Sequence, residues 1–487
     1  MKYGFDIMKA AGIAGLPWVI AFGVFLYLLV RRTKEKKRLA LLALMELILL
    51  MIPFTGKFLD QKFGDGTLAQ AFSLVPLVFL LSYAVVELAW NQLNKKRLVY
   101  IYAAAAIVLV SCLGFRPSMS RFYWLKDRGV YHQMLSKAGT DTILTTVDLT
   151  ENLPKGTRQV LSEEHGMGIA YEAAKSGAVL AVREDSELLN QSQLEQFGFK
   201  LVGSIREMRY YHYESDQNLW SITMNPGQSG LQSMSYIITD LKGHVYVLDG
   251  GQNEDCDYLR QRIRELGNHV DGWFLSHPHT DHVNALSTML ESGDYPEVDS
   301  YYVSDFDQEK YQAEAADWDV YSDYERIKRA METTGEQAKV KPIYAGDVLN
   351  MDGMQVKVLH DYTTKDGGDA ANDGSLVLKF YGEKTSMLFC ADTGASQSKT
   401  ILENYGQDLP ASYIQLGHHG NGGLSEEFYK KVASKGTLKV AFFDAPDWLY
   451  YPKESDWYNT PKQIALMTSL GAKCVHFADA PYSVLVQ

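Results

Sequence analysis

The chain has 487 residues, 46% of them hydrophobic and 22% charged, and a formal net charge of −12 at pH 7. This length predicts two to four domains, and with only four cysteines we expect no disulfide framework. An acidic chain gains little from counterion release on a polyanion, so the composition disfavours a dedicated nucleic-acid-binding protein.

Four long apolar segments lie near the start of the chain. The first, residues 11–30, is uncharged and long enough to cross a bilayer. Three more candidates follow at residues 39–54, 68–90 and 98–115. Four clustered segments with short loops are typical of membrane helices, and a cleaved signal peptide fits poorly because further spans follow the first. We therefore expect about four transmembrane helices in residues 1–115.

The basic loops predict the orientation of these spans. Residues 31–38 and 95–97 are rich in Lys and Arg, whereas residues 56–67 are balanced in charge. The positive-inside rule places both basic loops in the cytoplasm and everything after residue 115 outside it. We therefore expect a multi-pass protein of the cell membrane, with the lipid bilayer as a partner and an extracytoplasmic C-terminal portion. That portion, residues 116–487, holds 34 basic and 53 acidic residues.

Residues 116–213 predict a small extracytoplasmic α/β domain. Residues 142–147 and 178–182 have the apolar, β-branched composition of buried strands, and residues 187–197 have a helical pattern. No motif in this segment predicts chemistry.

A tight cluster of histidines and one aspartate follows the apolar run at residues 273–275: His277, His279, Asp281 and His282. In an extended segment residues i and i+2 point the same way, so His277 and His279 can share one metal ion. Asp281 and His282 lie where the chain turns into a helix, and they can reach a second ion. Imidazole and carboxylate are ligands that zinc, manganese or iron accept, and no cysteine is close in sequence. The motif therefore predicts a metal site.

Residues 305–335 interrupt the pattern of strands and are rich in Asp, Glu, Tyr and Lys. We expect an inserted segment that is helical at least over residues 324–333. Such a composition usually forms a solvated face, although an insertion at this point can also wall an active site.

Further motifs follow one order along residues 224–487: Asn-Pro-Gly-Gln at 225–228, Val-Leu-Asp-Gly-Gly at 247–251, the histidine cluster, Asn-Asp-Gly-Ser-Leu-Val-Leu at 372–378, Phe-Cys-Ala-Asp-Thr-Gly at 389–394 and Gly-His-His-Gly at 417–420. This series resembles the metallo-β-lactamase superfamily, and within it the extracytoplasmic hydrolase-like domain of the ComEC competence proteins. The resemblance implies an α+β fold over residues 214–487, a four-layer αββα sandwich with metals at one edge of its two sheets.

The resemblance also implies a dinuclear site with two divalent ions, zinc or manganese. The implied ligands are His277, His279, Asp281, His282, Asp392 and His418. Asp392 would bridge both ions, and Asp281 or Asp392 would orient the attacking water. His419 would face the substrate phosphate or donate a proton, although the sequence does not decide which of His418 and His419 is the ligand; we favour His418. Asp249 would support the loop that carries His277 through a hydrogen bond.

Two positions depart from the family pattern. Most relatives have a third histidine for the first ion where residues 371–374 read Ala-Asn-Asp-Gly. His360, at the end of an expected strand, is either a substitute ligand or a structural residue. Residues 458–461 read Tyr-Asn-Thr-Pro, where ComEC proteins usually have Tyr-Gly-His-Pro, and this difference weakens the transfer of their substrate to this chain.

The predicted chemistry is metal-assisted hydrolysis of a phosphate-containing substrate, which is a small molecule, a cell-wall polymer or single-stranded DNA. A phosphodiesterase or nuclease-like enzyme is the first hypothesis. The alternatives are a cell-wall phosphorylcholine-esterase-like enzyme and a ComEC-like component of DNA uptake. We do not find the large channel region that ComEC proteins carry, which disfavours the second alternative. A metal-free binding module is disfavoured by the full ligand set. Protein partners and oligomeric state are not predicted.

Overall fold

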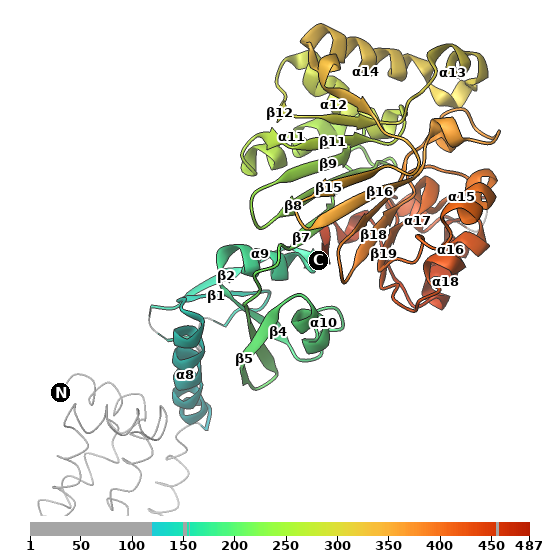
Figure 1. Ribbon diagram of the computed structural model, residues 1–487. Helices are drawn as coiled ribbons and strands as arrows, with labels where there is room; N and C mark the ends of the chain where they lie inside the picture. The colour runs from blue at the N-terminus through green and yellow to red at the C-terminus, as the bar shows by residue number, and fades with distance from the viewer. Residues whose placement is uncertain (1–118, 150–152, 155, 454–456) are drawn as a thin grey trace, which may run out of the picture. The chain divides into compact units, whose positions relative to one another are not determined.

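The computed structural model describes residues 119–149, 153–154, 156–453 and 457–487 (Figure 1). These residues fall into two compact units. One contains the helix α8 (Met119–Ala138) with residues 147–159 and 202–208, and the other contains residues 144–146, 160–201 and 209–487. The predicted membrane spans lie outside the described residues, and none of the described helices has the length and apolarity needed to cross a bilayer.

Two large sheets form the centre of the second unit. The first has eight strands, in the spatial order β14 (Val340–Pro342), β13 (Tyr301–Val303), β11 (Gly272–Leu275), β9 (Val245–Asp249), β8 (Ser235–Asp240), β7 (Trp220–Met224), β22 (Tyr482–Val486) and β3 (His165–Gly166). The second has seven, in the order β15 (Val348–Met351), β16 (Met354–His360), β17 (Val377–Tyr381), β18 (Ser386–Phe389), β19 (Tyr413–Gln415), β20 (Val440–Phe442) and β21 (Lys473–Val475).

Alternation along the strands builds the layers, because successive side chains of a strand point to opposite faces. In β8, Tyr236 and Ile238 belong to the core between the sheets, whereas Ile237 belongs to the core under the outer helices. In β18, Phe389 faces the core between the sheets and Leu388 faces the opposite helix layer. Each large side chain buried in this way contributes roughly 1.5–3 kcal/mol.

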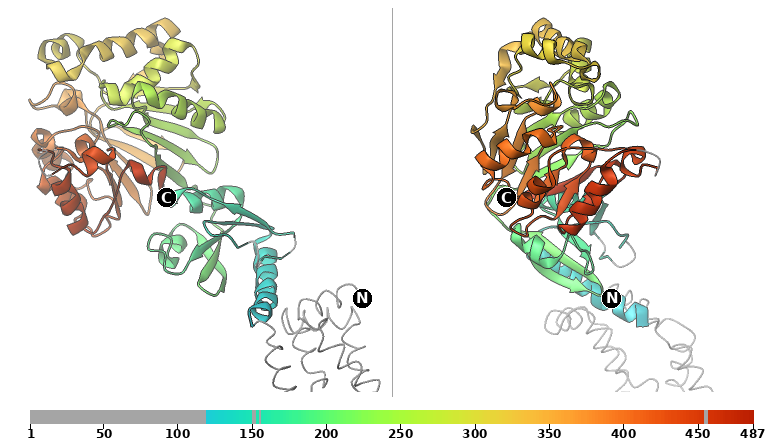
Figure 2. Two further views of the ribbon diagram at one scale, coloured as in Figure 1. Left: turned by 180° about the vertical axis from the view of Figure 1, so that it is seen from behind. Right: turned by 90° about the vertical axis from the view of Figure 1, so that its right-hand side faces the viewer.

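Helices cover the outer face of each sheet (Figures 1 and 2). The first sheet is covered by α11 (Cys256–Glu265), α12 (Thr280–Ser292) and α14 (Tyr321–Thr334). The second is covered by α15 (Ser398–Tyr405), α16 (Glu426–Val432), α17 (Asp447–Tyr450) and α18 (Thr460–Ser469). The predicted four-layer αββα sandwich is therefore confirmed for the C-terminal part of the chain.

The segment before Trp220 contains the predicted α/β elements. They are β1 (Thr142–Thr145), β2 (Arg158–Leu161), α9 (Gly168–Ser176), β4 (Val179–Arg183), α10 (Gln191–Gln196), β5 (Phe199–Ile205) and β6 (Met208–Tyr213). The expected strands at 142–147 and 178–182 and the expected helix at 187–197 are confirmed, the helix in shorter form. Residues 160–201 share a sheet and a core with the sandwich, because β3 pairs with β22 and Leu485 packs with Ile169. The predicted boundary at residue 213 stays a prediction.

The predicted insertion after β13 is confirmed as a helical excursion. It consists of α13 (Gln308–Glu314), a 3₁₀ turn η3 (Asp317–Asp319) and α14. An aromatic cluster ties it to the loop that follows β16: the Phe306 ring lies 4.4 Å from Tyr362 and 5.3 Å from Tyr311, centroid to centroid. Two minor strands, β10 (His269–Val270) and β12 (Glu297–Val298), pair beside the first sheet.

Candidate metal centre

The histidine cluster lies where β11 passes into α12. Residues 276–279 form an extended loop, and α12 begins at Thr280. The rings of His277 and His279 lie on one side of this loop, 4.6 Å apart between centroids. Asp281 and His282 follow in the first turn of the helix and are both buried. The loop thus presents two pairs of ligand atoms side by side, as the spacing of the motif predicts.

Asp392 reaches this cluster from the second sheet. It lies three residues beyond the end of β18 and is 2% exposed. Two bonds shape its turn: the Oε1 atom of Gln415 accepts the backbone N–H of Cys390 at 2.9 Å and that of Ala391 at 2.8 Å. Further along, Asp373 accepts the N–H of Gly394 at 2.8 Å. These hydrogen bonds hold the turn that carries Asp392 and so determine the direction of its carboxylate.

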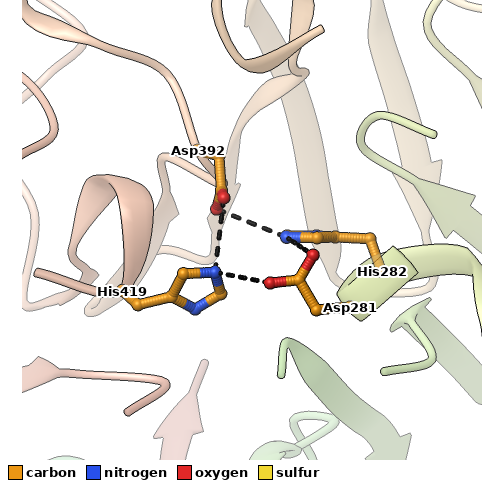
Figure 3. Close-up of side chains that lie close together, drawn as sticks. All are labelled: Asp281, His282, Asp392 and His419. Atoms are coloured by element: carbon orange, nitrogen blue, oxygen red, sulfur yellow. Dashed lines mark ion pairs between the residues drawn. The ribbon is translucent and has the colours of Figure 1, made fainter. Parts of the chain in front are cut away.

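His419 completes the group from the loop after β19 (Figure 3). Its Nε2 atom lies 3.0 Å from a carboxylate oxygen of Asp281 and 3.3 Å from one of Asp392. Its Nδ1 atom donates to the backbone carbonyl of Asp444 at 3.0 Å, which directs Nε2 towards the carboxylates. Both His418 and His419 have positive φ, 52° and 55°, so the chain turns sharply here and adjacent side chains diverge.

The structure brings together six ligand residues in two groups. One group contains His277, His279 and Asp392, and the other contains Asp281, His282, Asp392 and His419; within each group the atoms lie within 4.8 Å of one another. Asp392 belongs to both, as predicted for a bridging ligand. His418 belongs to neither among the described residues, so our preference for His418 as the ligand is corrected to His419.

Several atoms of this centre are buried without a hydrogen-bond partner in the described part of the chain. They are Nε2 of His277, His282 and His419 and Oδ1 of Asp392. A buried polar atom without a partner costs free energy. Imidazole nitrogens and carboxylates that converge in this way are the donor set of a divalent cation such as zinc or manganese. The residues therefore fit two adjoining metal ions.

Charges within the centre shift the pKa values of its groups. Burial lowers the pKa of His277 well below the usual value, and the neighbouring histidines lower it further. For His419, burial acts in the same direction, but the carboxylates of Asp392 and Asp281 outweigh it and raise the pKa to about 10. The carboxylates of Asp392, Asp249 and Asp281 also raise the pKa of His282 well above its usual value, although burial lowers it. Without metal these carboxylates thus favour the protonated forms of His282 and His419, so metal binding to these two residues displaces protons.

Two further carboxylates orient the ligands. Asp249 accepts the N–H of Ser276 at 2.7 Å and the Nδ1–H of His282 at 2.7 Å, which confirms its predicted contact with the loop. Asp319, from the insertion, is 0% exposed and accepts the Nε2–H of His279 at 3.0 Å. This bond leaves Nδ1 of His279 for an ion, and such a carboxylate raises the basicity of a metal-bound imidazole. No pattern in the sequence distinguished Asp319 as a functional residue.

His360 does not join the centre. Its Nε2 atom donates to the carbonyl of Asp373 at 2.8 Å, and its Nδ1 atom lies 2.9 Å from Oγ1 of Thr364. Both ring nitrogens of His360 therefore contact groups of the protein itself. The geometry favours a structural role for His360 over the role of a substitute metal ligand. At the place of the family's third histidine, the buried Oδ1 atom of Asn372 has no hydrogen-bond partner among the described residues.

The chain is similar to known proteins in the part that contains the centre. Residues 229–416 match the family model of the metallo-beta-lactamase superfamily. Similar solved structures include the metallo-beta-lactamase fold protein YhfI from Bacillus subtilis (12% identity, TM-score 0.34, 55% of this chain and 99% of that chain covered) and unliganded yeast PDE1 (11%, 0.34, 53% and 97%). Another is zinc-bound PqqB from Methylobacterium extorquens (11%, 0.34, 55% and 99%). No curated protein matches the chain.

The finer resemblance to ComEC proteins remains a prediction. The family match and the four-layer sandwich both concern the C-terminal part of the chain, where the buried histidines and aspartates lie. Residues 229–416 of this chain therefore match the metallo-beta-lactamase superfamily, in a part of the chain with a mixed α+β fold.

Proposed function

We propose that this chain is a membrane-anchored, metal-dependent phosphodiesterase with a dinuclear site outside the cytoplasm. The observation that carries the proposal is the pair of adjoining ligand groups that share Asp392. Two cations held by these groups would neutralise an anionic phosphoryl group and activate water at neutral pH. The first group offers only three protein ligands, so an ion held there would have positions open for substrate and water.

The surrounding residues have separate tasks in this proposal. Asp281 belongs to one ligand group and Asp392 to both, and either carboxylate would accept a hydrogen bond from an attacking water. Because His419 is part of the ligand set, we assign the role of proton donor to the neighbouring residue, His418. His418 is half-buried, and its ring centroid lies 6.0 Å from that of His419. A protonated imidazole beside the centre would donate a proton to a leaving oxygen, and such general-acid catalysis typically contributes a factor of about 10²–10⁴ to the rate.

The charge near the site supports a small substrate over a long polyanion. The insertion at residues 305–335 holds nine acidic and four basic residues, and it contacts the centre through Asp319 and through Asp323, which accepts a hydrogen bond from Thr280. A surface of this sign repels DNA, which gains affinity from basic residues. We therefore favour small phosphodiesters as the substrates, and the experiment below tests nuclease activity as the alternative.

The test uses the purified full-length protein, loaded with zinc or with manganese. The substrates are bis(p-nitrophenyl) phosphate, p-nitrophenyl phosphate and single-stranded DNA, and Asp392→Asn is the control variant. We expect metal-dependent cleavage of the diester that the variant loses. Cleavage of DNA in preference to the small diester would replace the proposal with a nuclease, and a metal-loaded protein that cleaves none of the three would refute hydrolysis of phosphate esters.

The membrane anchor and the location of the site rest on the sequence of residues 1–115. The basic loops at residues 31–38 and 95–97 support an extracytoplasmic site, because the positive-inside rule places both loops in the cytoplasm. A reporter fused after Gln487 should be active only outside the cytoplasm, and one fused within residues 31–38 only inside. Activity of the C-terminal fusion in the cytoplasm would overturn the orientation.

A further inference from the structure

A cavity of about 260 Å³ lies beside the metal-binding loop. His277 and Pro278 form one wall, and the residues just after β13, Ser304 to Phe306, form another. The insertion supplies the third wall, because one face of α14 lines the cavity with residues at helical spacing: Tyr324, Ile327, Lys328 and Met331. The cavity therefore lies at the carboxyl ends of parallel strands β11, β13 and β14, a usual place for ligands in sheets of this kind.

The walls of this cavity are mainly apolar. Val303, Ile327 and Met331 contribute aliphatic or thioether surface, and Phe306 and Tyr324 contribute aromatic rings. A cavity of roughly 150 Å³ with apolar walls binds benzene, so this larger one can hold a substituted ring. Aromatic rings favour stacked or edge-on contacts with another ring, worth about 0.5–1.5 kcal/mol beyond burial.

The charged groups of the cavity already have partners. Lys328 donates from Nζ to Oε1 of Gln308 at 2.7 Å, and Asp305 accepts the hydroxyl of Tyr344 at 2.7 Å. A cationic ligand would meet the Lys328 ammonium, and an anionic one would meet the Asp305 carboxylate. An uncharged group avoids both repulsions.

We propose that this cavity receives a flat, uncharged aromatic group of the substrate, an aryl ring or a nucleobase, while the attached phosphodiester lies at the metal centre. His277 belongs to both places, since this residue lines the cavity and is a member of one ligand group. One ester group of the diester therefore enters the cavity, and the other leaves. The assignment rests on the proposed phosphodiesterase activity and names its substrate class.

The first test compares three diesters that share p-nitrophenolate as the leaving group. The second ester group is methyl, phenyl or choline, so differences in KM report this group alone. We expect the KM of the phenyl ester to be about tenfold lower than that of the methyl ester, because ring burial in the cavity strengthens binding. Equal KM values for methyl and phenyl, or the lowest KM for the choline ester, would overturn the assignment.

The second test fills the cavity. Val303→Trp places a large side chain into it, and Val348→Trp is the matched control, since it makes the same replacement at an exposed valine that does not line the cavity. We expect Val303→Trp to lose the preference for phenyl over methyl, and Val348→Trp to keep it. If Val303→Trp does not fold, Gln337→Trp blocks the exposed edge of the same cavity. A blocked cavity that still prefers phenyl contradicts the proposal.

A binding measurement separates this proposal from the activity on which it rests. Calorimetry with phenylphosphonate and methylphosphonate needs no turnover. If no ester is cleaved but phenylphosphonate binds about tenfold more tightly, and Val303→Trp removes this difference, the cavity assignment stands and the proposed activity falls. If all esters are cleaved with one KM and the two phosphonates bind equally, the activity stands and the cavity assignment falls.

Discussion

Replacement of Asp319 by Asn should weaken metal binding without unfolding the protein. The carboxylate of Asp319 is fully buried; one oxygen accepts the Nε2–H of His279 at 3.0 Å and the other accepts the N–H of Ala316 at 2.6 Å. An amide at this position has one acceptor and one donor, so it can satisfy only one of these two N–H groups. It also removes the negative charge that raises the basicity of the imidazole ligand.

Loss of such an outer partner typically costs a factor of 10–100 in metal affinity, about 1.4–2.8 kcal/mol. Because Asp319 is buried and its bond is charge-assisted, we expect about thirtyfold weaker binding, in the middle of this range. Competition with a chelating dye measures the affinity for zinc or manganese, and a thermal melt of the metal-free protein checks the fold. The control is Asp317→Asn, which makes the same change of charge at an exposed residue of the same turn. An Asp319→Asn variant that binds metal as tightly as Asp317→Asn would refute the reasoning.

Three further predictions concern single side chains. Asp392→Asn should lose both metal ions together, since the residue belongs to both ligand groups; elemental analysis that finds one ion retained would contradict a bridging role. His419→Ala should lower the metal content, whereas His418→Ala should lower kcat and keep the metal, and the reverse pattern would restore our first preference. A hydrogen bond with Asp240 raises the pKa of His244 against partial burial, so its contribution to stability is complete below the unfolded pKa and disappears as the pH rises through the raised value. His244→Gln should therefore lower Tm more at about pH 5.5 than at about pH 9, and an equal loss at both would exclude this pair as a pH-dependent contribution.

The parts of the centre that depend on local sequence could be predicted. The i, i+2 spacing of His277 and His279 in an extended loop determines that both rings face one side. An apolar strand that ends shortly before Asp392 likewise predicts a carboxylate at the edge of a sheet. In both cases the geometry follows from the backbone of one short segment.

The remaining parts depend on contacts between distant segments. Asp319 lies forty residues beyond His279 and is one of nine acidic residues in the insertion, so neither periodicity nor composition distinguishes it from its solvated neighbours. The choice between His418 and His419 depends on the carbonyl of Asp444, which accepts from His419. No pattern within the Gly-His-His-Gly segment encodes that bond.

The position of β22 has a consequence for how the chain folds. This strand, Tyr482–Val486, pairs with β7 on one side and with β3 on the other. Until Tyr482–Val486 has been synthesised, β7 has an unpaired edge whose N–H and C=O groups are open to pairing with another chain. Closure of the sheet thus joins segments that lie far apart in the sequence, and such high contact order slows folding. Nascent and truncated chains that lack Tyr482–Val486 should therefore depend on chaperones and aggregate through β7, whereas a chain that contains these residues buries β7 inside the sheet.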